Sequence, residues 1–459
     1  MELRGKKVLV VGLGKSGLAA ALFLRRRGAQ VTVSDLRSAQ ALSNEIPSLL
    51  EAGISVEAGG HGLLTFRRQD LIVVSPGVPL STPELVQVRT LGLPIIGELE
   101  LAARFLQGNV LAITGSNGKT TTTTLCGEIF SAAGLTMLVA GNIGLPVIEV
   151  VEQSSAGAWS VLEVSSFQLE TTESFHPRIA IILNITPDHL DRHGTFENYV
   201  SMKEKIFAKQ TSEDTLILNG DDAVTQQAAS RARSRVFWFS RNNIVRRGAF
   251  LRNGLILYRA SEQSSPVAVL PVSEIPLKGD HNVENVLAAV CAASVAGVSP
   301  EVIARAVASF HAVEHRLEFV ASIQGVDYYN DSKATNVDAT AKAIAAFPGN
   351  IHLILGGKDK NSDYTQLNPL LQSRVKAVYT VGSAAEKIES QIAGVAKVVR
   401  AGTIDAAVDQ AAGQALAGDV VLLAPACSSF DQFENYEQRG RTFKQAVLSR
   451  RGAGVWQSV

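Results

Sequence analysis

The residues best suited to chemistry lie in a glycine-containing loop at 114–121, which reads TGSNGKTT. A short apolar run at 110–113 precedes the loop, and a helical pattern follows it. Backbone N–H groups of such a loop at a helix N-terminus point toward an anion, and the helix dipole favours negative charge there. Lys119 would contact the β- and γ-phosphates of a nucleotide, and the Thr120 hydroxyl would contact Mg²⁺. The loop therefore predicts a nucleotide-binding site.

The spacing of this loop differs from the usual P-loop pattern. A G-x-x-x-x-G-K pattern would place its first glycine at position 113, which is Ile113, whereas Gly115 precedes Gly118 by only three residues. The alternative is an ordinary turn between a strand and a helix, with a solvated lysine. The spacing narrows the choice of family, and other parts of the chain must identify it.

Polar side chains also follow two other apolar runs. Glu163 ends the run at 161–163, and the run at 179–183 leads to the segment NITPDH, which ends at His189. Residues at the carboxyl ends of parallel strands face bound ligands. Because Mg²⁺ prefers oxygen ligands and is commonly held by one or two carboxylates, Glu163 suits a magnesium site. His189 is a less usual magnesium ligand and could instead be a hydrogen-bonded structural histidine.

A second glycine pattern lies near the N-terminus, where Gly12, Gly14 and Gly17 form a G-x-G-x-x-G motif after an apolar run. The next residues predict a helix over 18–27, and a second apolar run leads to Asp35. This arrangement is typical of dinucleotide-binding domains, in which the acidic residue contacts a ribose hydroxyl. The same geometry can hold another diphosphate, such as a nucleotide-sugar. The motif alone therefore leaves an NAD-dependent enzyme and a nucleotide-sugar enzyme equally open.

An aliphatic run followed by glycines and a helical pattern occurs three times, at 8–17, 110–119 and 351–360. Continuous Val/Ile/Leu runs are typical of buried parallel strands. Because the three units lie far apart in the chain, they predict three α/β domains rather than a repeat array. The polar stretch 240–265 predicts loops and hairpins within the middle domain. The predicted domains are 1–97, 98–312 and 313–459.

Composition limits the class of protein. The chain has 459 residues, enough for about three domains, and 46% hydrophobic with 6% aromatic residues is typical of a soluble α/β enzyme. Lys+Arg and Asp+Glu both number 43, so we expect a small-molecule substrate and no nucleic acid. The three cysteines lack the spacing of a zinc site or a disulfide framework, which favours a reducing compartment. No apolar run is long enough for a membrane span or a signal peptide, so we expect a cytoplasmic protein without membrane contact, and a monomer.

Nine segments together resemble the Mur ligase family, and they occur in order along most of the chain. Two of them, SSFQLE and PACSSFDQF, resemble the branch of the family that adds D-glutamate. No single segment carries the resemblance, whereas nine in order are specific. The segments are TGSNGKTT (114–121), GNIG (141–144), EVSSFQLE (163–170), NITPDHLDRH (184–193), GDHNVENVLAA (279–289), EHRLE (314–318), NDSKATN (330–336), LGGKDK (355–360) and PACSSFDQFENYEQRG (425–440).

The resemblance implies an ATP-dependent ligase of peptidoglycan synthesis that joins D-glutamate to UDP-N-acetylmuramoyl-L-alanine. In this family the alanyl carboxylate is phosphorylated, and the amine of the amino acid then attacks the acyl phosphate and displaces phosphate. The resemblance also implies a Rossmann-like N-terminal domain for the UDP substrate, a P-loop-like central ATPase domain and a Rossmann-like C-terminal domain for the amino acid. Because charge builds on the transferring phosphoryl group, positioned cations and Mg²⁺, implied here as two ions, would supply most of the catalysis.

Family positions carried onto this chain give the catalytic set Lys119, Asn142, Glu163, His189 and Lys203. Lys203 matches a lysine that the family carbamylates, which would convert a cation that repels Mg²⁺ into an anionic oxygen ligand. The alternative for Lys203 is a solvated helix lysine. The implied metal ligands are Thr120, Glu163, His189 and the carbamate of Lys203. The implied ATP-binding residues are Gly115, Ser116, Asn117, Gly118, Lys119, Thr120, Thr121, Asn282, Asn285, Arg316 and Asp331.

The resemblance also implies residues for both substrates. Lys358 stands where the family pattern has an acid, and Tyr436 adds a hydroxyl where phenylalanine is also familiar. Ser428 could be only a turn residue, and Asn285 could instead brace a helix. Cationic and hydroxyl donors suit a dicarboxylate such as glutamate. The UDP substrate would contact Lys15, Ser16, Asp35, Arg37, Ser75, Gly77 and Asn142, and D-glutamate would contact Lys333, Thr335, Lys360, Ser428, Ser429 and Tyr436.

Because Lys119 and Arg316 belong to different predicted domains, the resemblance implies that ATP lies between domains and that catalysis requires closure. Three rival functions remain. An NAD oxidoreductase would bind nicotinamide without hydrolysing a nucleotide. A nucleotide switch protein would hydrolyse ATP without needing the other two substrates. A sibling ligase, or the related folate polyglutamylase, would accept a different amino acid or acceptor.

Overall fold

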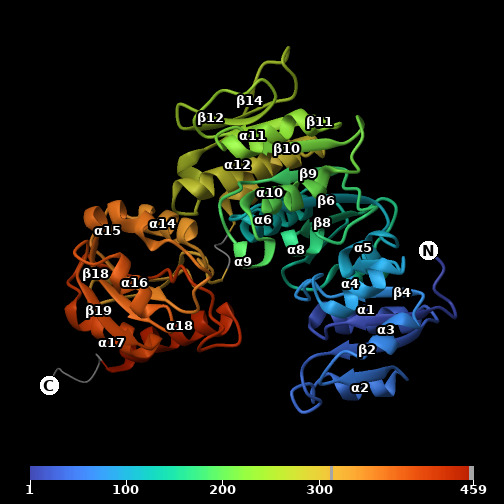
Figure 1. Ribbon diagram of the computed structural model, residues 1–459. Coiled ribbons are helices and arrows are strands. Elements are labelled where there is room, and N and C mark those ends of the chain that lie inside the picture. Colours follow the sequence, from blue (N-terminus) through green and yellow to red (C-terminus); the bar gives the residue numbers. More distant parts are fainter. Residues whose placement is uncertain (311–313, 454–459) are drawn as a thin grey trace. The chain divides into compact units, whose positions relative to one another are not determined.

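The computed structural model describes residues 1–310 and 314–453 and contains three β-sheets with flanking helices (Figure 1). The three-domain α/β fold predicted from the sequence is confirmed. The predicted limits of the domains stay a prediction, and the limit between 312 and 313 lies outside the described residues. The chain forms two compact units: unit 1 comprises Met1–Ile185, Glu197–Pro271 and Val286–Val307, and unit 2 comprises Thr186–Phe196, Val272–Asn285 and the chain from Ala308 onward.

The first sheet lies in unit 1, has the order β3-β2-β1-β4-β5 and is parallel throughout. The chain adds strands on one side of β1 and then on the other, so the strand order reverses between β1 and β4. Ligands bind at the carboxyl ends of the strands at such a point. The strands are β1 (Lys7–Val11), β2 (Gln30–Asp35), β3 (Ser55–Ala58), β4 (Leu71–Val74) and β5 (Ile95–Gly97), and the helices are α1 (Lys15–Arg26), α2 (Ile46–Glu51), α3 (Leu63–Arg67), α4 (Pro83–Thr90) and α5 (Glu98–Ala103).

The second sheet, also in unit 1, has nine strands in the order β14-β13-β12-β11-β10-β9-β6-β8-β7. Its strand β6 pairs in parallel with β8 and β9, so the loop after β6 emerges beside the ends of both neighbours. The last strands are antiparallel, and the hairpin of β12 and β13 confirms the hairpins predicted within 240–265. The strands are β6 (Asn109–Thr114), β7 (Met137–Gly141), β8 (Trp159–Glu163), β9 (Ile179–Ile182), β10 (Thr215–Asn219), β11 (Arg235–Ser240), β12 (Gly248–Arg252), β13 (Leu255–Arg259) and β14 (Val267–Pro271).

Helices of the middle part of the chain connect these strands. The longest of them, α12, crosses from the residues of unit 2 into those of unit 1 at Asn285. The helices are α6 (Lys119–Ala132), α7 (Val147–Val150), α8 (Ser166–Leu169), α9 (Leu190–His193), α10 (Phe196–Glu204), α11 (Ala223–Ala228), α12 (Asp280–Val295) and α13 (Pro300–Ala308). Short 3₁₀ helices are Val151–Gln153, Lys205–Phe207, Ala229–Arg231, Val272–Glu274 and Tyr364–Leu367.

The third sheet lies in unit 2, has the order β15-β16-β20-β17-β18-β19 and is parallel except for β15. Successive residues of β17 point to opposite faces: Leu353 and Leu355 pack in a cluster with residues of α14 and α15, and Ile354 packs in another with residues of α17 and α18. The strands are β15 (Glu318–Ile323), β16 (Val326–Asn330), β17 (Ile351–Gly356), β18 (Val375–Val381), β19 (Val398–Gly402) and β20 (Val420–Leu423), and the helices are α14 (Val337–Ala345), α15 (Asn368–Arg374), α16 (Ala385–Gln391), α17 (Ile404–Gln414) and α18 (Tyr436–Ala453).

Two predicted elements differ from those observed. The predicted helix over 18–27 begins three residues earlier, at Lys15, because Gly14 already has the extended conformation of a residue that precedes a helix. The third glycine unit lacks a helix directly after its strand. Lys358 there pairs with Ser428 through two backbone hydrogen bonds, of 2.8 and 3.1 Å, which continues the extended chain beyond β17.

A buried carboxyl group links two helices of unit 1. Glu98, at the start of α5, is 1% exposed, and its Oε1 accepts a hydrogen bond from the backbone N–H of Ile148 at 2.7 Å. Burial raises the pKa of Glu98 to about 7, the nearby Glu149 carboxylate adds to the rise, and the N–H groups of Val147 and Ile148 limit it. The folded protein therefore binds a proton at Glu98 more tightly than the unfolded chain does.

Replacing Glu98 by glutamine is expected to change the pH dependence of stability. The stabilisation from protonated Glu98 is complete below the unfolded pKa of 4.5 and is lost as the pH rises to about 7. At pH 8 the E98Q variant should therefore have a free energy of unfolding about 1–3 kcal/mol above that of the parent protein, with little difference at pH 4.5. Urea unfolding of both proteins at the two pH values measures this, and parallel pH profiles would contradict it.

Candidate functional site

The phosphate loop follows β6, and two glycines with positive φ angles shape it. Gly115 has φ 155° and Gly118 has φ 87°, and Gly118 directly precedes α6. A Cβ atom on Gly115 would come within 3.0 Å of the Cβ of Leu183. The glycines therefore allow a tight turn at the N-terminus of a 14-residue helix, where backbone N–H groups bind phosphate.

Asn184, the second residue after β9, braces this loop, and it was not among the residues predicted from the sequence. The side chain of Asn184 accepts a hydrogen bond from the backbone N–H of Asn117 at 2.9 Å and donates one to the Asn117 carbonyl at 3.1 Å. The Asn184 carbonyl accepts a hydrogen bond from Ser116 N–H at 2.9 Å, and the Ser116 hydroxyl lies 3.1 Å from that of Tyr199. The sequence contains a signal for this residue, because Asn184 is the first residue of the NITPDH segment and directly follows an apolar run.

Two lysine side chains converge on one carbonyl of the loop. The Nζ of Lys119 donates to the carbonyls of Gly115 and Ser116 at 2.8 and 2.7 Å, and the Nζ of Lys203 donates to Gly115 at 2.8 Å. Lys203 is 1% exposed, and its Nζ lies 4.5 Å from the ring centroid of Tyr199. Lys203 is therefore not a solvated helix lysine, because its side chain is buried against the phosphate loop.

A buried carboxylate stands at the end of β8, beside the end of β7. The Nδ2 of Asn142 donates to Glu163 Oε1 at 2.8 Å, and the backbone N–H of Asn142 donates to the Glu163 carbonyl at 2.9 Å. The Oε2 of Glu163 is buried and has no hydrogen-bond partner among the described residues. Because a buried carboxylate oxygen without a partner is costly, this oxygen suits a cation. Thr120, in the first turn of α6, is buried as well.

The first sheet brings the two predicted UDP residues Asp35 and Arg37 together. Asp35 accepts hydrogen bonds from the backbone N–H of Leu13 at 2.6 Å and from the Nε of Arg37 at 3.1 Å. Burial acts to raise the pKa of Asp35, but hydrogen bonds from Arg37 and Leu13 outweigh it and keep the pKa below its usual value. Asp35 is therefore a charged acceptor directly beside the glycine-rich turn.

That turn shows why its glycines are needed. Gly12 has φ 86°, and a Cβ atom on Gly17 would lie 1.9 Å from the Gly12 carbonyl oxygen. The Ser75 hydroxyl, just after β4, donates to the same oxygen at 2.7 Å. The structure thus places these predicted UDP residues around the carboxyl ends of β1, β2 and β4. Lys15 and Ser16 begin α1, and Gly77 lies exposed two residues after Ser75.

In unit 2, five of the six residues predicted for D-glutamate follow three neighbouring parallel strands, and the sixth, Tyr436, begins α18. Lys333 and Thr335 follow β16, Lys360 follows β17, and Ser428 and Ser429 follow β20. The carboxyl ends of these strands meet at one edge of the sheet, so the five residues share that edge. The Ser428 hydroxyl donates to the Lys358 carbonyl at 3.1 Å, which gives this side chain a structural role in the turn.

His189 belongs to unit 2 and has an unusual backbone conformation. Its φ of 53° is left-handed, directly before α9. The neighbouring Asp188 accepts hydrogen bonds from Asn336 Nδ2 at 3.0 Å and from Lys360 Nζ at 3.4 Å. Asp188 therefore fixes Lys360, and it was not among the residues predicted from the sequence although it stands within the NITPDH segment. Pairing across 172 residues of sequence left no local signal.

The predicted adenine-side and ribose-side residues of unit 2 fall into two groups. Asn285 Nδ2 donates to Asn282 Oδ1 at 3.1 Å, and Asn282 Nδ2 donates to the Lys278 carbonyl at 2.7 Å, so the two asparagines brace the start of α12. Burial raises the pKa of Asp331 to about 7, and the charge of Arg316 limits the rise.

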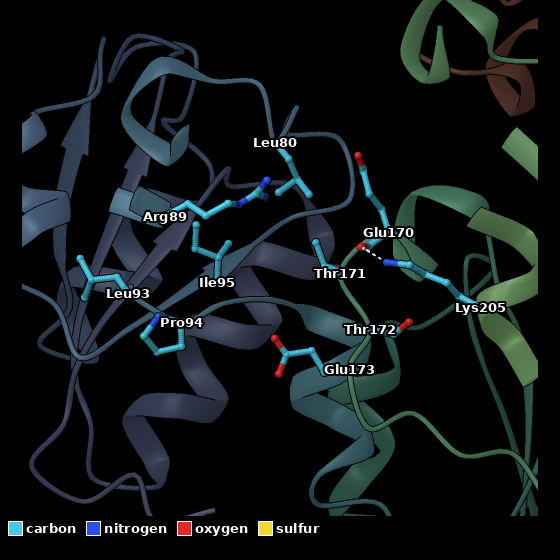
Figure 2. Close-up of a pocket in the computed structure, with 10 residues that line it drawn as sticks. All are labelled: Leu80, Arg89, Leu93, Pro94, Ile95, Glu170, Thr171, Thr172, Glu173 and Lys205. Carbon is cyan, nitrogen blue, oxygen red and sulfur yellow. Dashed lines mark hydrogen bonds between the residues drawn. The ribbon is translucent and has the colours of Figure 1, made fainter. Parts of the chain in front are cut away.

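A pocket of about 440 Å³ in unit 1 is formed by none of the residues predicted to bind a ligand (Figure 2). One wall carries apolar side chains from the region of α4 and β5, and the other carries the segment after α8. Lys205 donates to the Glu170 carbonyl at 2.7 Å on this second wall. The lining residues are Leu80, Arg89, Leu93, Pro94, Ile95, Glu170, Thr171, Thr172, Glu173 and Lys205.

One cluster of acidic residues and a histidine in unit 2 resembles a metal site in its spacing alone. Glu314, His315 and Glu318 offer ligand atoms within 4.8 Å of one another. The Nζ of Lys444 lies 2.9 Å from a carboxylate oxygen of Glu314 and 2.7 Å from one of Glu318. An ammonium group therefore already pairs with both carboxylates, and the cluster is an ion-pair network.

Family models match most of the chain. The models are described as the Mur ligase MurD-like N-terminal domain at residues 6–97, the Mur ligase middle domain at 113–293 and the Mur ligase glutamate ligase domain at 315–427. The chain belongs to the Mur ligase family, which confirms the resemblance seen in the sequence motifs. Among the described residues, no helix combines the length and the apolar character that crossing a bilayer requires.

Two curated relatives carry the name UDP-N-acetylmuramoylalanine–D-glutamate ligase. The protein of Acidobacterium capsulatum is 72% identical over 459 residues and covers 100% of both chains, and that of Koribacter versatilis is 59% identical over 97% of this chain and 98% of its own. A solved structure, the UDP-N-acetylmuramate–alanine ligase of Thermotoga maritima, has a TM-score of 0.60 at 19% identity and covers 97% of this chain and 100% of its own. This last similarity concerns the fold.

Proposed function

We propose that this chain is an ATP-dependent ligase that joins the amine of D-glutamate to the alanyl carboxylate of UDP-N-acetylmuramoyl-L-alanine. The observation that carries the proposal is the 72% identity, over the full length of both chains, to a relative named for this reaction. The shape of the phosphate loop supports the use of ATP in this reaction, and so does Glu163 Oε2, which is buried and has no hydrogen-bond partner among the described residues. The reaction belongs to peptidoglycan precursor synthesis, which we place in the cytoplasm, and we propose a monomer.

Residues of unit 1 are suited to hold the nucleotide phosphates and Mg²⁺. The loop 115–121 would wrap the phosphates, with Lys119 as the cation beside them. Glu163 and Thr120 offer oxygen ligands to Mg²⁺, which supplies charge neutralisation for the transferring phosphoryl group when it is bound. Asn142 orients Glu163 through its 2.8 Å hydrogen bond. His189, in unit 2, is proposed as a further ligand, and a count of two ions belongs to the same proposal.

Lys203 is proposed to act as a carbamate. A neutral lysine amine adds to CO₂ to form an N-carboxylate and releases one proton, so a cation becomes an anionic oxygen donor. The side chain is buried beside the phosphate loop, where an ammonium group would oppose a bound Mg²⁺. The modification would therefore convert repulsion into coordination.

The two other substrates are assigned to the edges of two further sheets. Asp35 offers a charged acceptor for ribose or uracil donors, and Lys15, Ser16, Arg37, Ser75 and Gly77 surround the same edge. In unit 2, Lys360 and Lys333 supply positive charge for the two carboxylates of glutamate, and Thr335 and Ser429 supply hydroxyl donors. Arg316 and Asp331 are proposed for the phosphates and the ribose of ATP, and Asn282 and Asn285 for the adenine side.

Phosphate release provides the test of this function. Purified protein with ATP and Mg²⁺ should release phosphate when UDP-N-acetylmuramoyl-L-alanine and D-glutamate are both present. Omission of either substrate, or exchange for L-glutamate, glycine, L-lysine or meso-diaminopimelate, should lower the rate at least about 100-fold, because the site must pair both carboxylates in one geometry. Equal rates with another amino acid would assign the chain to a sibling ligase, and release independent of both substrates would indicate a simple ATPase.

A further inference from the structure

One arginine of unit 2 is buried beneath the loops that carry the residues assigned to D-glutamate. Arg439, in the first turn of α18, is 1% exposed. Its Nε donates to the Ser332 hydroxyl at 3.0 Å, and one terminal nitrogen donates to the Ser332 carbonyl at 2.9 Å. Both terminal nitrogens donate to the Cys427 carbonyl at 3.1 Å, and one reaches the Ser428 carbonyl at 3.3 Å. One guanidinium group thus holds two loops that are far apart in sequence.

The acceptors of this guanidinium group are uncharged oxygens. Burial lowers the pKa of Arg439 to about 10, so the side chain remains charged at neutral pH. A buried cation without a carboxylate partner in hydrogen-bond contact costs stability that an apolar side chain of similar volume would not. A role in folding alone therefore accounts poorly for an arginine at this position.

The same turn of α18 contacts the loops at further points. The Ser332 hydroxyl donates to the Tyr436 carbonyl at 2.8 Å, and the Lys333 Nζ lies 3.8 Å from the ring centroid of Tyr436. A Cβ atom on Gly357 would come within 3.0 Å of a terminal nitrogen of Arg439, so the segment after β17 also packs against it. All three segments that supply the proposed glutamate residues therefore meet at this turn.

We propose that Arg439 is a positioning residue for the amino-acid substrate. Its planar guanidinium group fixes the loop of Lys333 and Thr335 against the loop of Ser428 and Ser429, and its buried charge raises the positive potential near a ligand with two carboxylates. This inference rests on the proposed assignment of the D-glutamate pocket. It predicts that changes at Arg439 affect the KM for D-glutamate more than the KM for either other substrate.

The test replaces Arg439 by lysine, which keeps the charge and loses the planar guanidinium group. R439K should raise the KM for D-glutamate at least about tenfold, through the loss of several charge-assisted hydrogen bonds, with the KM for ATP and for the UDP substrate changed less than about threefold. S332A, which removes one acceptor and leaves the arginine, should raise the same KM by a smaller factor. The thermal midpoint is measured for every variant.

Arg374 provides the matched control, because it is another arginine of unit 2 that donates to backbone carbonyls, those of Ala345 and Phe347. R374K should leave the KM for D-glutamate unchanged. Equal increases in all three KM values, or an unchanged KM for D-glutamate in both R439K and S332A, would overturn the inference. The K360A variant separates the proposed role of Arg439 from the proposed assignment of the D-glutamate pocket. If K360A also leaves the KM for D-glutamate unchanged, the assignment of the pocket itself is wrong.

Discussion

The E163Q variant is expected to release phosphate at least about 1,000-fold more slowly than the parent protein when all substrates are saturating. The change removes the negative charge from a buried oxygen that has no hydrogen-bond partner among the described residues. If Glu163 is the proposed carboxylate ligand, its loss would weaken the binding of Mg²⁺ and the stabilisation of the charge on the transferring phosphoryl group. A 1,000-fold effect corresponds to about 4 kcal/mol. Initial rates across a range of Mg²⁺ concentrations measure both kcat and the apparent Mg²⁺ affinity.

Two controls separate this effect from a loss of structure. A neutral amide at position 163 should keep or raise the thermal midpoint, because it removes the charge from a buried group of which one oxygen has no hydrogen-bond partner among the described residues. E152Q changes an exposed glutamate of the same unit, which lies 3.5 Å from Arg27, and should leave the rate within about twofold of the parent. An E163Q protein that keeps more than a tenth of the activity would refute the assigned role.

The K203A variant is expected to lose activity about 100- to 1,000-fold, because the protein would lose an anionic metal ligand. K203R distinguishes the carbamate from a simple cation, since arginine keeps the charge and does not form a carbamate, and it should be as inactive as K203A. The parent protein should lose activity when CO₂ and bicarbonate are removed and regain it when they return. A carbamate signal in ¹³C NMR spectra of protein supplied with ¹³C-bicarbonate should be absent from K203A.

Lys205 lies two residues away and serves as the matched control for this series. It contacts the Glu170 carbonyl on the wall of the unit 1 pocket, so K205A should retain activity and the CO₂ response. Full activity of K203A, together with indifference of the parent protein to CO₂, would remove the carbamate hypothesis. If K203R is active and K203A is inactive, the result would instead favour a role for the positive charge of Lys203.

Much of the fold was predictable because each buried parallel strand has a local sequence pattern, a continuous apolar run. The apolar runs before Gly12, Gly115 and Gly356 became β1, β6 and β17, and polar residues after such runs came to lie at the carboxyl edges of sheets. Glu163 could be selected for this reason alone, since its place at the end of a strand follows from the sequence around it.

The supporting residues of the candidate sites could not be predicted in this way. Asn184 braces Asn117 across 67 residues, Asp188 contacts Lys360 across 172, and Arg439 holds Ser332 across 107. In the sequence, Arg439 looks like any polar residue in the first turn of a helix, and its burial depends on packing that no local pattern encodes. The left-handed backbone conformation of His189 could not be predicted either, because a histidine, unlike a glycine, does not indicate a positive φ angle.

The strand order of the third sheet has a consequence during protein synthesis. β20 (Val420–Leu423) lies between β16 and β17, both of which precede it in the chain. The ribosome therefore completes β16 and β17 while the strand that joins them has not yet been made, and each exposes a hydrogen-bonding edge in the meantime. Such edges invite pairing with other nascent chains. The first sheet, in contrast, is complete once residue 97 has emerged, so its strands acquire their neighbours while the growing chain is still short.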